Sequence, residues 1–178
     1  MAPDWTGGVY ASPTISGSRA GGVIAGTWAA MLKIGQEGYV NTAKKILDGV
    51  KIIADGIRKM DEVELYGEPD LCVVCFGANR KKSSPLNIYG ISDALSKKKW
   101  NLNLLQNPAS IHICVTYANC KMAHEFVRDV EDAIKQVKAN PEEFSKGTAA
   151  IYGMASSLPD KAPVCQIARS FIDSLYIV

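Results

Sequence analysis

The chain is poor in the side chains from which most catalytic sites are built. It has only two histidines, His112 and His124, and they stand far from one another and from any cysteine pair. No nucleophile can be matched with a base, and no carboxylate pair or metal-binding cluster emerges from the spacing. We therefore expect structural or exposed histidines, and no self-contained catalytic centre in these residues.

A strong excess of charge of one sign is also missing. The 20 basic and 18 acidic residues give a net charge of +2. The basic clusters at 80–82 and 97–99 are short and lack interleaved aromatic residues, which argues against nucleic acid as a partner. We expect a solvated turn for the first cluster and a helix C-terminus for the second.

The five cysteines do not form the pattern of a disulfide framework, because their number is odd and the chain is long for a cysteine-stapled domain. The cysteine content fits a protein of a reducing compartment better than a secreted protein. Cys72 and Cys75 form a CxxC motif, but no second CxxC or histidine pair completes a metal site. The motif lies in LCVVCFG, where strand alternation sends the two thiols to opposite faces. We expect two core cysteines.

Signals for export and membrane insertion are absent from these residues. MAPDWTGG is not a signal peptide, because no basic region is followed by an apolar one. The longest apolar run, 23–32, contains Gly26 and Thr27 and is too short to span a bilayer. The content of 47% apolar and 21% charged residues predicts a globular protein with a buried core.

Hydrophobic periodicity predicts an α+β fold with a small, mostly antiparallel sheet covered by helices. The expected helices cover 20–34, 39–60, 85–98, 121–138 and 161–176, and the expected strands cover 63–67, 71–78, 101–106 and 110–117. The first helix is apolar or small almost all round, which is typical of a buried helix. Gly35 and Gly38 should separate it from the second helix, which is amphipathic.

Helix starts are predicted from capping residues. Ser84 should cap the third helix with Pro85 at its first position, and Asp160 should cap the last helix. The last helix should bury one apolar stripe, made of Val164, Ile167, Ala168, Phe171, Ile172 and Leu175.

The stretch YASPTISGSRAGG, residues 10–22, predicts an anion site. Gly17 can adopt positive φ and Ser18 can cap the following helix, so that the first free N–H groups point outward at the positive end of the helix dipole. Arg19 adds a planar cation that suits phosphate, and Gly21 and Gly22 leave room for close approach. The stretch is neither a P-loop nor a dinucleotide fingerprint. The alternative is that Ser18 only caps a helix while Arg19 makes a surface ion pair.

Four segments in order carry a resemblance to a known family. DWTGGVYASPTISGSRAGG, KKKWNLNLLQNPASIHICVT, GTAAIYGMASSLPD and FIDSLY closely resemble the C-terminal portion of the sphingosine-1-phosphate lyases. These belong to the pyridoxal-phosphate-dependent group II decarboxylase family, of the aspartate aminotransferase fold type (fold type I). Ala20 departs from the proline that the family usually has in GSRPGG.

The resemblance implies a homodimeric enzyme that cleaves sphingosine 1-phosphate, a phosphorylated sphingoid base, into a long-chain aldehyde and phosphoethanolamine. Its cofactor, pyridoxal 5'-phosphate, serves as an electron sink. The family holds this cofactor on a lysine in a His-Lys pair that precedes DWTGG, and this chain has no His-Lys dipeptide. The resemblance therefore implies an excised, inactive C-terminal portion. The parent's membrane anchor would place it at the endoplasmic reticulum, facing the cytosol.

By position, the resemblance assigns Gly17 and Ser18 to cofactor binding. It assigns the other site residues to substrate or phosphate binding: Tyr10, Ser12, Arg19 and Tyr152. A plain core tyrosine is an equal alternative for Tyr152. Trp100 to Gln106 matches a family signature, which we interpret as small-domain core and strand.

The implied organisation is an active-site loop at 1–18, connecting helices at 19–60, a small α/β domain at 61–140 and a C-terminal extension with the final helix at 141–178. Two other functions stay open: an amino-acid decarboxylase of the same family, and a non-catalytic anion-binding or interaction module. Without a large domain and a partner subunit, the helix at 20–34 should expose apolar surface and favour self-association or disorder.

Overall fold

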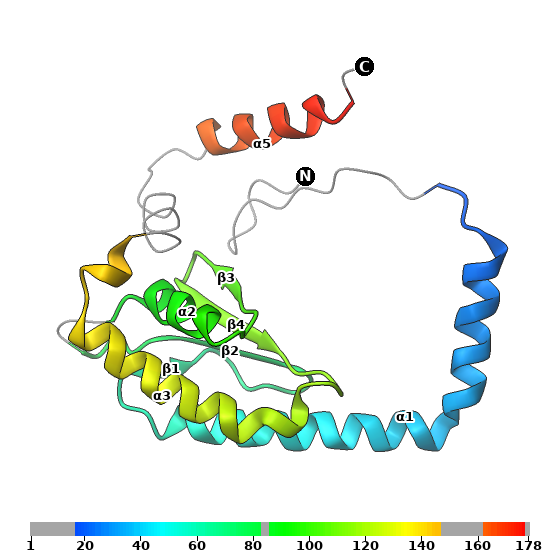
Figure 1. Cartoon of the computed structure of the whole chain (residues 1–178), viewed down its shortest axis with the longest axis horizontal. Helices are drawn as coiled ribbons and strands as arrows, with labels where there is room; N and C mark the ends of the chain where they lie inside the picture. Colours follow the sequence, from blue (N-terminus) through cyan, green and yellow to red (C-terminus); the bar gives the residue numbers. More distant parts are fainter. Residues whose placement is uncertain (1–16, 83–85, 147–161, 177–178) are drawn as a thin grey trace.

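The computed structural model describes residues 17–82, 86–146 and 162–176. Its helices are α1 (Gly21–Arg58), α2 (Ile88–Lys97), α3 (Ala123–Ala139) and α5 (Ala162–Ser174), with short 3-10 turns η1 (Cys120–Met122) and η2 (Glu143–Ser145). Its strands are β1 (Val63–Leu65), β2 (Val73–Ala78), β3 (Asn103–Leu105) and β4 (Ser110–Cys114). Figure 1 shows the sheet and α2 and α3 gathered beside the second half of α1.

The sheet is four-stranded and antiparallel at every pairing, in the order β1-β2-β4-β3. Strands β2 and β4 pair at its centre, although α2 and β3 lie between them in the chain. Alternate residues of the two central strands point at the helices and are buried, namely Val74, Phe76, Ile111 and Ile113. The predicted α+β fold, with a small antiparallel sheet covered by helices, is confirmed.

The core lies between this face of the sheet and three helices. Phe126 of α3 is fully buried, and its ring meets Phe76 edge-on at 6.5 Å and Trp100 at 4.9 Å between centroids. The predicted inward positions of α2 are confirmed, since Ile88, Ile91 and Leu95 are all buried. Trp100 belongs to this core, in agreement with the interpretation of its motif.

Helix α1 is kinked at the predicted place. Gly35 has φ +64° and ψ 173°, a conformation that is non-helical and essentially restricted to glycine. The residues after the kink run along the core, where Val50, Ile53 and Ile57 are buried. The residues before the kink turn away from the rest of the chain, as Figure 1 shows.

The residues of α1 before the kink, 21–34, are exposed, and we call them the N-terminal half of α1. Trp28 exposes 65% of its surface, and the other large apolar side chains of this half are also exposed, namely Val23, Ile24, Met31, Leu32 and Ile34. An all-apolar helix was expected to be buried; that expectation is wrong for this chain, because its described residues supply no layer against this half. The separate prediction was that this helix exposes apolar surface when no large domain or partner subunit covers it, and that prediction is confirmed.

The predicted cap of the third expected helix is corrected. Helix α2 begins at Ile88, and its cap is Asn87, whose side-chain oxygen accepts a hydrogen bond from the Tyr89 N–H at 3.1 Å. The predicted cap at Ser84 with Pro85 therefore lies outside the helix, and 83–85 are outside the described residues. The end of α2 at Lys97 agrees with the prediction. Lys99 then takes φ +72° in the turn that closes the helix.

Helix α5 buries none of its residues within 162–176. Ile167 and Phe171 expose 71% and 63% of their surfaces, and Leu175 is exposed as well. The predicted buried stripe is thus wrong for this chain, because the described part of the protein places nothing against it. Asp160 lies outside the described residues. Across the described ranges, no helix has the length and apolar character needed to cross a bilayer.

Candidate functional site

The segment predicted to bind an anion leads into α1. Helix α1 begins at Gly21, and its N-cap is Ala20, in an extended conformation with φ −64° and ψ 132°. The predicted cap at Ser18 is wrong, because the helix starts too late for a side chain two residues before Ala20 to occupy the N-cap position. Ser18 and Arg19 are exposed, as is Gly17.

The start of α1 still has the chemistry of an anion site. The carbonyl of Ala20 accepts hydrogen bonds from Val23 and Ile24, at 3.1 and 3.5 Å between heavy atoms. The N–H groups of Gly21 and Gly22 precede these and have no acceptor within the helix, since the first N–H groups of any α-helix lack one. Arg19 lies close before them in the chain, so its positive guanidinium is near the positive end of the helix dipole.

The glycines here leave open space. A Cβ on Gly17, Gly21 or Gly22 would find no described atom within 4 Å. The chain's own packing therefore does not require glycine at these positions, and a ligand or another backbone could come close. Because the segment is exposed, water screens its charges unless a further surface covers it. Tyr10, Ser12 and Tyr152 lie outside the described residues, so the structure does not place them against it.

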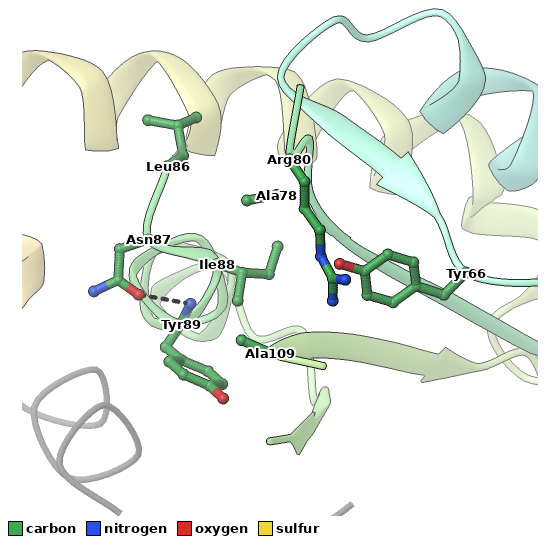
Figure 2. A pocket seen from close by; sticks show the side chains of 8 residues that line it. All are labelled: Tyr66, Ala78, Arg80, Leu86, Asn87, Ile88, Tyr89 and Ala109. Carbon is green, nitrogen blue, oxygen red and sulfur yellow. Dashed lines mark hydrogen bonds between the residues drawn. The ribbon is translucent and has the colours of Figure 1, made fainter. Parts of the chain in front are cut away.

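A separate pocket of about 240 Å³ lies between the end of β2 and the start of α2. Figure 2 shows Arg80 reaching over the ring of Tyr66, and the guanidinium carbon lies 5.4 Å from the ring centroid. Asn87, on the opposite wall, uses its oxygen to cap α2. Sequence reasoning missed this pocket, because it treated Arg80 as part of a solvated turn. The turn itself is exposed as predicted.

On the sheet face turned away from the helices, a cysteine and a histidine lie opposite one another, which is the pairing expected of a nucleophile and its base. Cys75 and His112 are direct partners across β2 and β4. Burial raises the pKa of Cys75 in spite of the neighbouring Ser110 hydroxyl, which lowers it, and burial lowers the pKa of His112. Both groups are therefore neutral near pH 7, which is the opposite of an activated thiolate beside an imidazolium. His124 is exposed, in line with expectation.

The cysteines of the CxxC motif are half-buried, so the expectation of two core cysteines is corrected. Cys72 lies in a bend before β2, and Cys75 lies on the less covered face of the sheet. Sequence reasoning also missed that Cys114 lies beside Cys72. The pairing of β2 with β4 brings the two cysteines together, and no local sequence motif predicts this contact. Within the described ranges, no three His, Cys, Asp or Glu side chains gather as metal ligands.

Comparison with known proteins gives a consistent result. No family model matches the chain. It is 43% identical over 173 residues to the sphingosine-1-phosphate lyase of Arabidopsis thaliana, which covers 97% of this chain and 31% of that protein. It is 40% identical over 178 residues to the sphingosine-1-phosphate lyase of Drosophila melanogaster, covering 99% of this chain and 32% of that protein.

A solved structure supports the same relationship. The sphingosine-1-phosphate lyase of Burkholderia pseudomallei matches with a TM-score of 0.61 and 35% sequence identity, over 74% of this chain and 29% of that one. The chain thus spans about a third of the length of the relatives it matches. Over nearly its whole length, the chain is a homologue of a part of the sphingosine-1-phosphate lyases.

Proposed function

We propose that this chain is the C-terminal part of a pyridoxal-phosphate-dependent lyase that cleaves sphingosine 1-phosphate into a long-chain aldehyde and phosphoethanolamine. The observation that carries the proposal is the similarity to enzymes named for this activity, at 43% identity over 97% of the chain. The fold agrees, because the solved lyase shares the described architecture. In the full-length protein we further propose a homodimer, anchored at the endoplasmic reticulum membrane through a segment outside these residues.

The residues at the start of α1 fit a phosphate group. The hydroxyl of Ser18 and the guanidinium of Arg19 are donors, and the first N–H groups of α1 add to them. Gly17, Gly21 and Gly22 leave the space that a phosphate needs. We assign Gly17 and Ser18 to the phosphate of pyridoxal 5'-phosphate, and Arg19 to a phosphate of the substrate, with Tyr10, Ser12 and Tyr152 as further contacts.

When bound, the cofactor supplies an electron sink for the pair of electrons released as the carbon–carbon bond breaks. The residues of this chain do the binding and orienting. Arg19 would hold the substrate phosphate in a fixed direction, because its planar fork pairs with two phosphate oxygens at once. The N-terminal half of α1 would then be covered by the rest of the enzyme, which would remove the water that screens this charge.

We also propose the following organisation: residues 1–18 form an active-site loop, 19–60 connecting helices, 61–140 the small domain and 141–178 an extension. The chain by itself should be inactive, because it lacks the His-Lys pair that carries the cofactor in the family. Incubating the purified chain with pyridoxal 5'-phosphate and sphingosine 1-phosphate should yield no aldehyde. Turnover by this chain alone would contradict the assignment of the lysine to another segment.

Borohydride reduction tests the placement of the cofactor lysine directly. Full-length protein incubated with pyridoxal 5'-phosphate, reduced and digested should carry its label on a lysine that precedes Asp4. A label on a lysine within residues 1–178 would mean that the boundaries proposed here are wrong. A full-length protein that takes no label would support the non-catalytic binding module in place of the lyase.

Replacing Arg19 by alanine in the full-length enzyme should raise KM for sphingosine 1-phosphate by about 10- to 100-fold, because a charge-assisted hydrogen bond to phosphate is lost. Folding should be unaffected, since Arg19 is exposed. The matched control is Lys44→Ala, which removes an exposed cation from the part of α1 that follows the kink and should change KM less than about twofold. Equal substrate affinity in Arg19→Ala and wild type would show that Arg19 does not bind the substrate phosphate.

A further inference from the structure

Two cysteines far apart in the sequence meet at one end of the central strand pair. The Sγ of Cys114, the last residue of β4, donates a weak hydrogen bond to the Sγ of Cys72 at 3.9 Å. The neighbouring backbone is paired as in a sheet. Val73 is the direct partner of Cys114, and the Val115 N–H donates to the Cys72 carbonyl at 2.7 Å.

Direct partners in an antiparallel pair lie about 4.5–5.5 Å apart between α-carbons, and disulfides use a spacing of roughly 4.4–6.8 Å, so the backbones of neighbouring paired strands suit a disulfide. In a regular strand Cys72 would point away from Cys114, because it follows the opposite alternation from Val73. Cys72 instead lies in a bend directly before β2 begins at Val73, so this alternation does not apply to it. A bond requires the two sulfur atoms to approach from 3.9 Å to about 2.05 Å, a movement on the scale that side-chain rotation provides.

The pair is open to small reagents, and both cysteines are free. Cys114 is exposed and Cys72 is half-buried. Burial and the neighbouring Cys72 raise the pKa of Cys114, so neither a stable thiolate nor an activated nucleophile is favoured. Within the described ranges no third ligand joins the two sulfurs, which argues against a thiolate metal site.

We propose that Cys72 and Cys114 are a modification site that forms a reversible disulfide by exchange with a low-molecular-weight disulfide, such as oxidised glutathione. The minor thiolate form of the exposed Cys114 attacks one sulfur of the small disulfide, expels one thiolate and leaves a mixed disulfide on Cys114. The thiolate of Cys72 then attacks the Sγ of Cys114 and expels the second thiolate. Two electrons and two protons pass from the protein to the small disulfide, which becomes two thiols.

The bond would tie the bend before β2 to the end of β4. The turn after β4 leads to Cys120, whose backbone oxygen would lie 3.0 Å from a Cβ on Gly49 of α1. The disulfide would therefore close the sheet at the end where the chain passes beside α1 on its way to α3, and should protect that end from opening. This inference does not depend on the lyase activity, since it uses only contacts within the described core.

The test is thiol–disulfide equilibration of the whole 178-residue chain in glutathione buffers, followed by acid quench, alkylation and peptide mapping. Fully reduced chain should take five alkyl groups and oxidised chain three, with a cross-linked peptide that joins Cys72 to Cys114. The equilibrium constant for the cross-link should be at least about 30-fold larger in the folded chain than in concentrated urea, because the fold holds the thiols together.

Cys72→Ser and Cys114→Ser should each abolish the cross-link. The matched controls are Cys120→Ser and Cys165→Ser, which remove other free cysteines and should retain it. Three results would overturn the proposal: stable glutathione adducts on both cysteines without a cross-link, a Cys72 bond to Cys75, or a cross-link no more favoured in the folded chain than in urea. The wild-type comparison needs no variant, so the proposal stays testable if a serine variant does not fold.

Discussion

At the residue scale, the carboxylate of Asp129 in α3 joins two neighbouring side chains at the edge of the core. One of its oxygens accepts a hydrogen bond from Lys98 at 2.6 Å, and the other accepts from the indole N–H of Trp100 at 2.7 Å. Its side chain exposes 16% of its surface. Burial alone would raise the pKa of Asp129, but the bonds from Lys98 and Trp100 outweigh burial and lower it below its usual value.

Replacing Asp129 by asparagine should lower the free energy of unfolding by about 1 to 2 kcal/mol at pH 7, because both bonds lose their charge assistance. A carboxyl whose pKa is lower in the folded state stabilises the fold above its unfolded pKa and loses this effect as pH falls through the folded value. The difference between wild type and variant should therefore shrink below about pH 4. Urea unfolding at pH 7 and at pH 3 measures it.

The control for this prediction is Asp132→Asn. Asp132 also contacts Lys98, at 3.2 Å, but exposes 51% of its side chain, so its removal should cost less than about 0.5 kcal/mol. An equal loss in the two variants, or a difference between wild type and Asp129→Asn that does not change with pH, would contradict the role given to Asp129.

Single residues were the hardest level to predict from sequence. Ser18 and Ser84 are good capping residues by type, yet Ala20 and Asn87 occupy the caps. The position of the N-cap depends on where the packed face of the helix begins, and several nearby residues satisfy the residue preference of an N-cap equally well. The Cys72–Cys114 and Arg80–Tyr66 contacts could not be predicted either, because they follow from strand pairing between distant segments.

At the scale of elements, α1 and α3 pack closely through Gly56. A Cβ added to Gly56 would lie 2.6 Å from both methyl groups of Val127. Gly56→Ala should lower the free energy of unfolding by about 1 to 2 kcal/mol, because the overpacking cost exceeds the gain in helix propensity. Chemical denaturation with the helix signal as the probe measures the change.

Gly26→Ala is the matched control within the same helix. No described atom lies within 4 Å of a Cβ there, so the variant should keep the unfolding midpoint of the core and slightly increase the helical signal. A Gly56→Ala chain as stable as wild type would show that the two helices can move apart without cost.

Most elements could be predicted from periodicity. The break at Gly35, the inward face of α2 and the four strands all follow from residue patterns that are local and strong. The outcome for α5 and the N-terminal half of α1 could not be predicted in the same way. An apolar stripe indicates that a face needs a partner, but it does not say whether this chain contains that partner.

At the scale of the whole molecule, two apolar helix surfaces are left uncovered by the part of the chain that the structure describes, on the N-terminal half of α1 and on α5. We expect the purified chain to self-associate in a concentration-dependent manner, since exposed apolar area of this kind favours contact between copies. Sedimentation velocity over a range of concentrations measures this, and Trp28→Lys should shift the distribution toward monomer.

Leu71→Lys is the control for self-association, because Leu71 is an exposed apolar side chain, 72% accessible, outside both helices. It should leave the distribution unchanged. A chain that stays monomeric at every concentration would show that these surfaces are covered within the chain itself, in contradiction to the described structure.

Product analysis of the full-length protein tests most directly our proposal that these residues belong to a sphingosine-1-phosphate lyase. With pyridoxal 5'-phosphate present, each sphingosine 1-phosphate consumed should give one long-chain aldehyde and one phosphoethanolamine, and omission of the cofactor should abolish both products. Release of carbon dioxide from an amino acid by the cofactor-loaded protein, with sphingosine 1-phosphate left intact, would contradict the claim and assign the protein to the amino-acid decarboxylases instead.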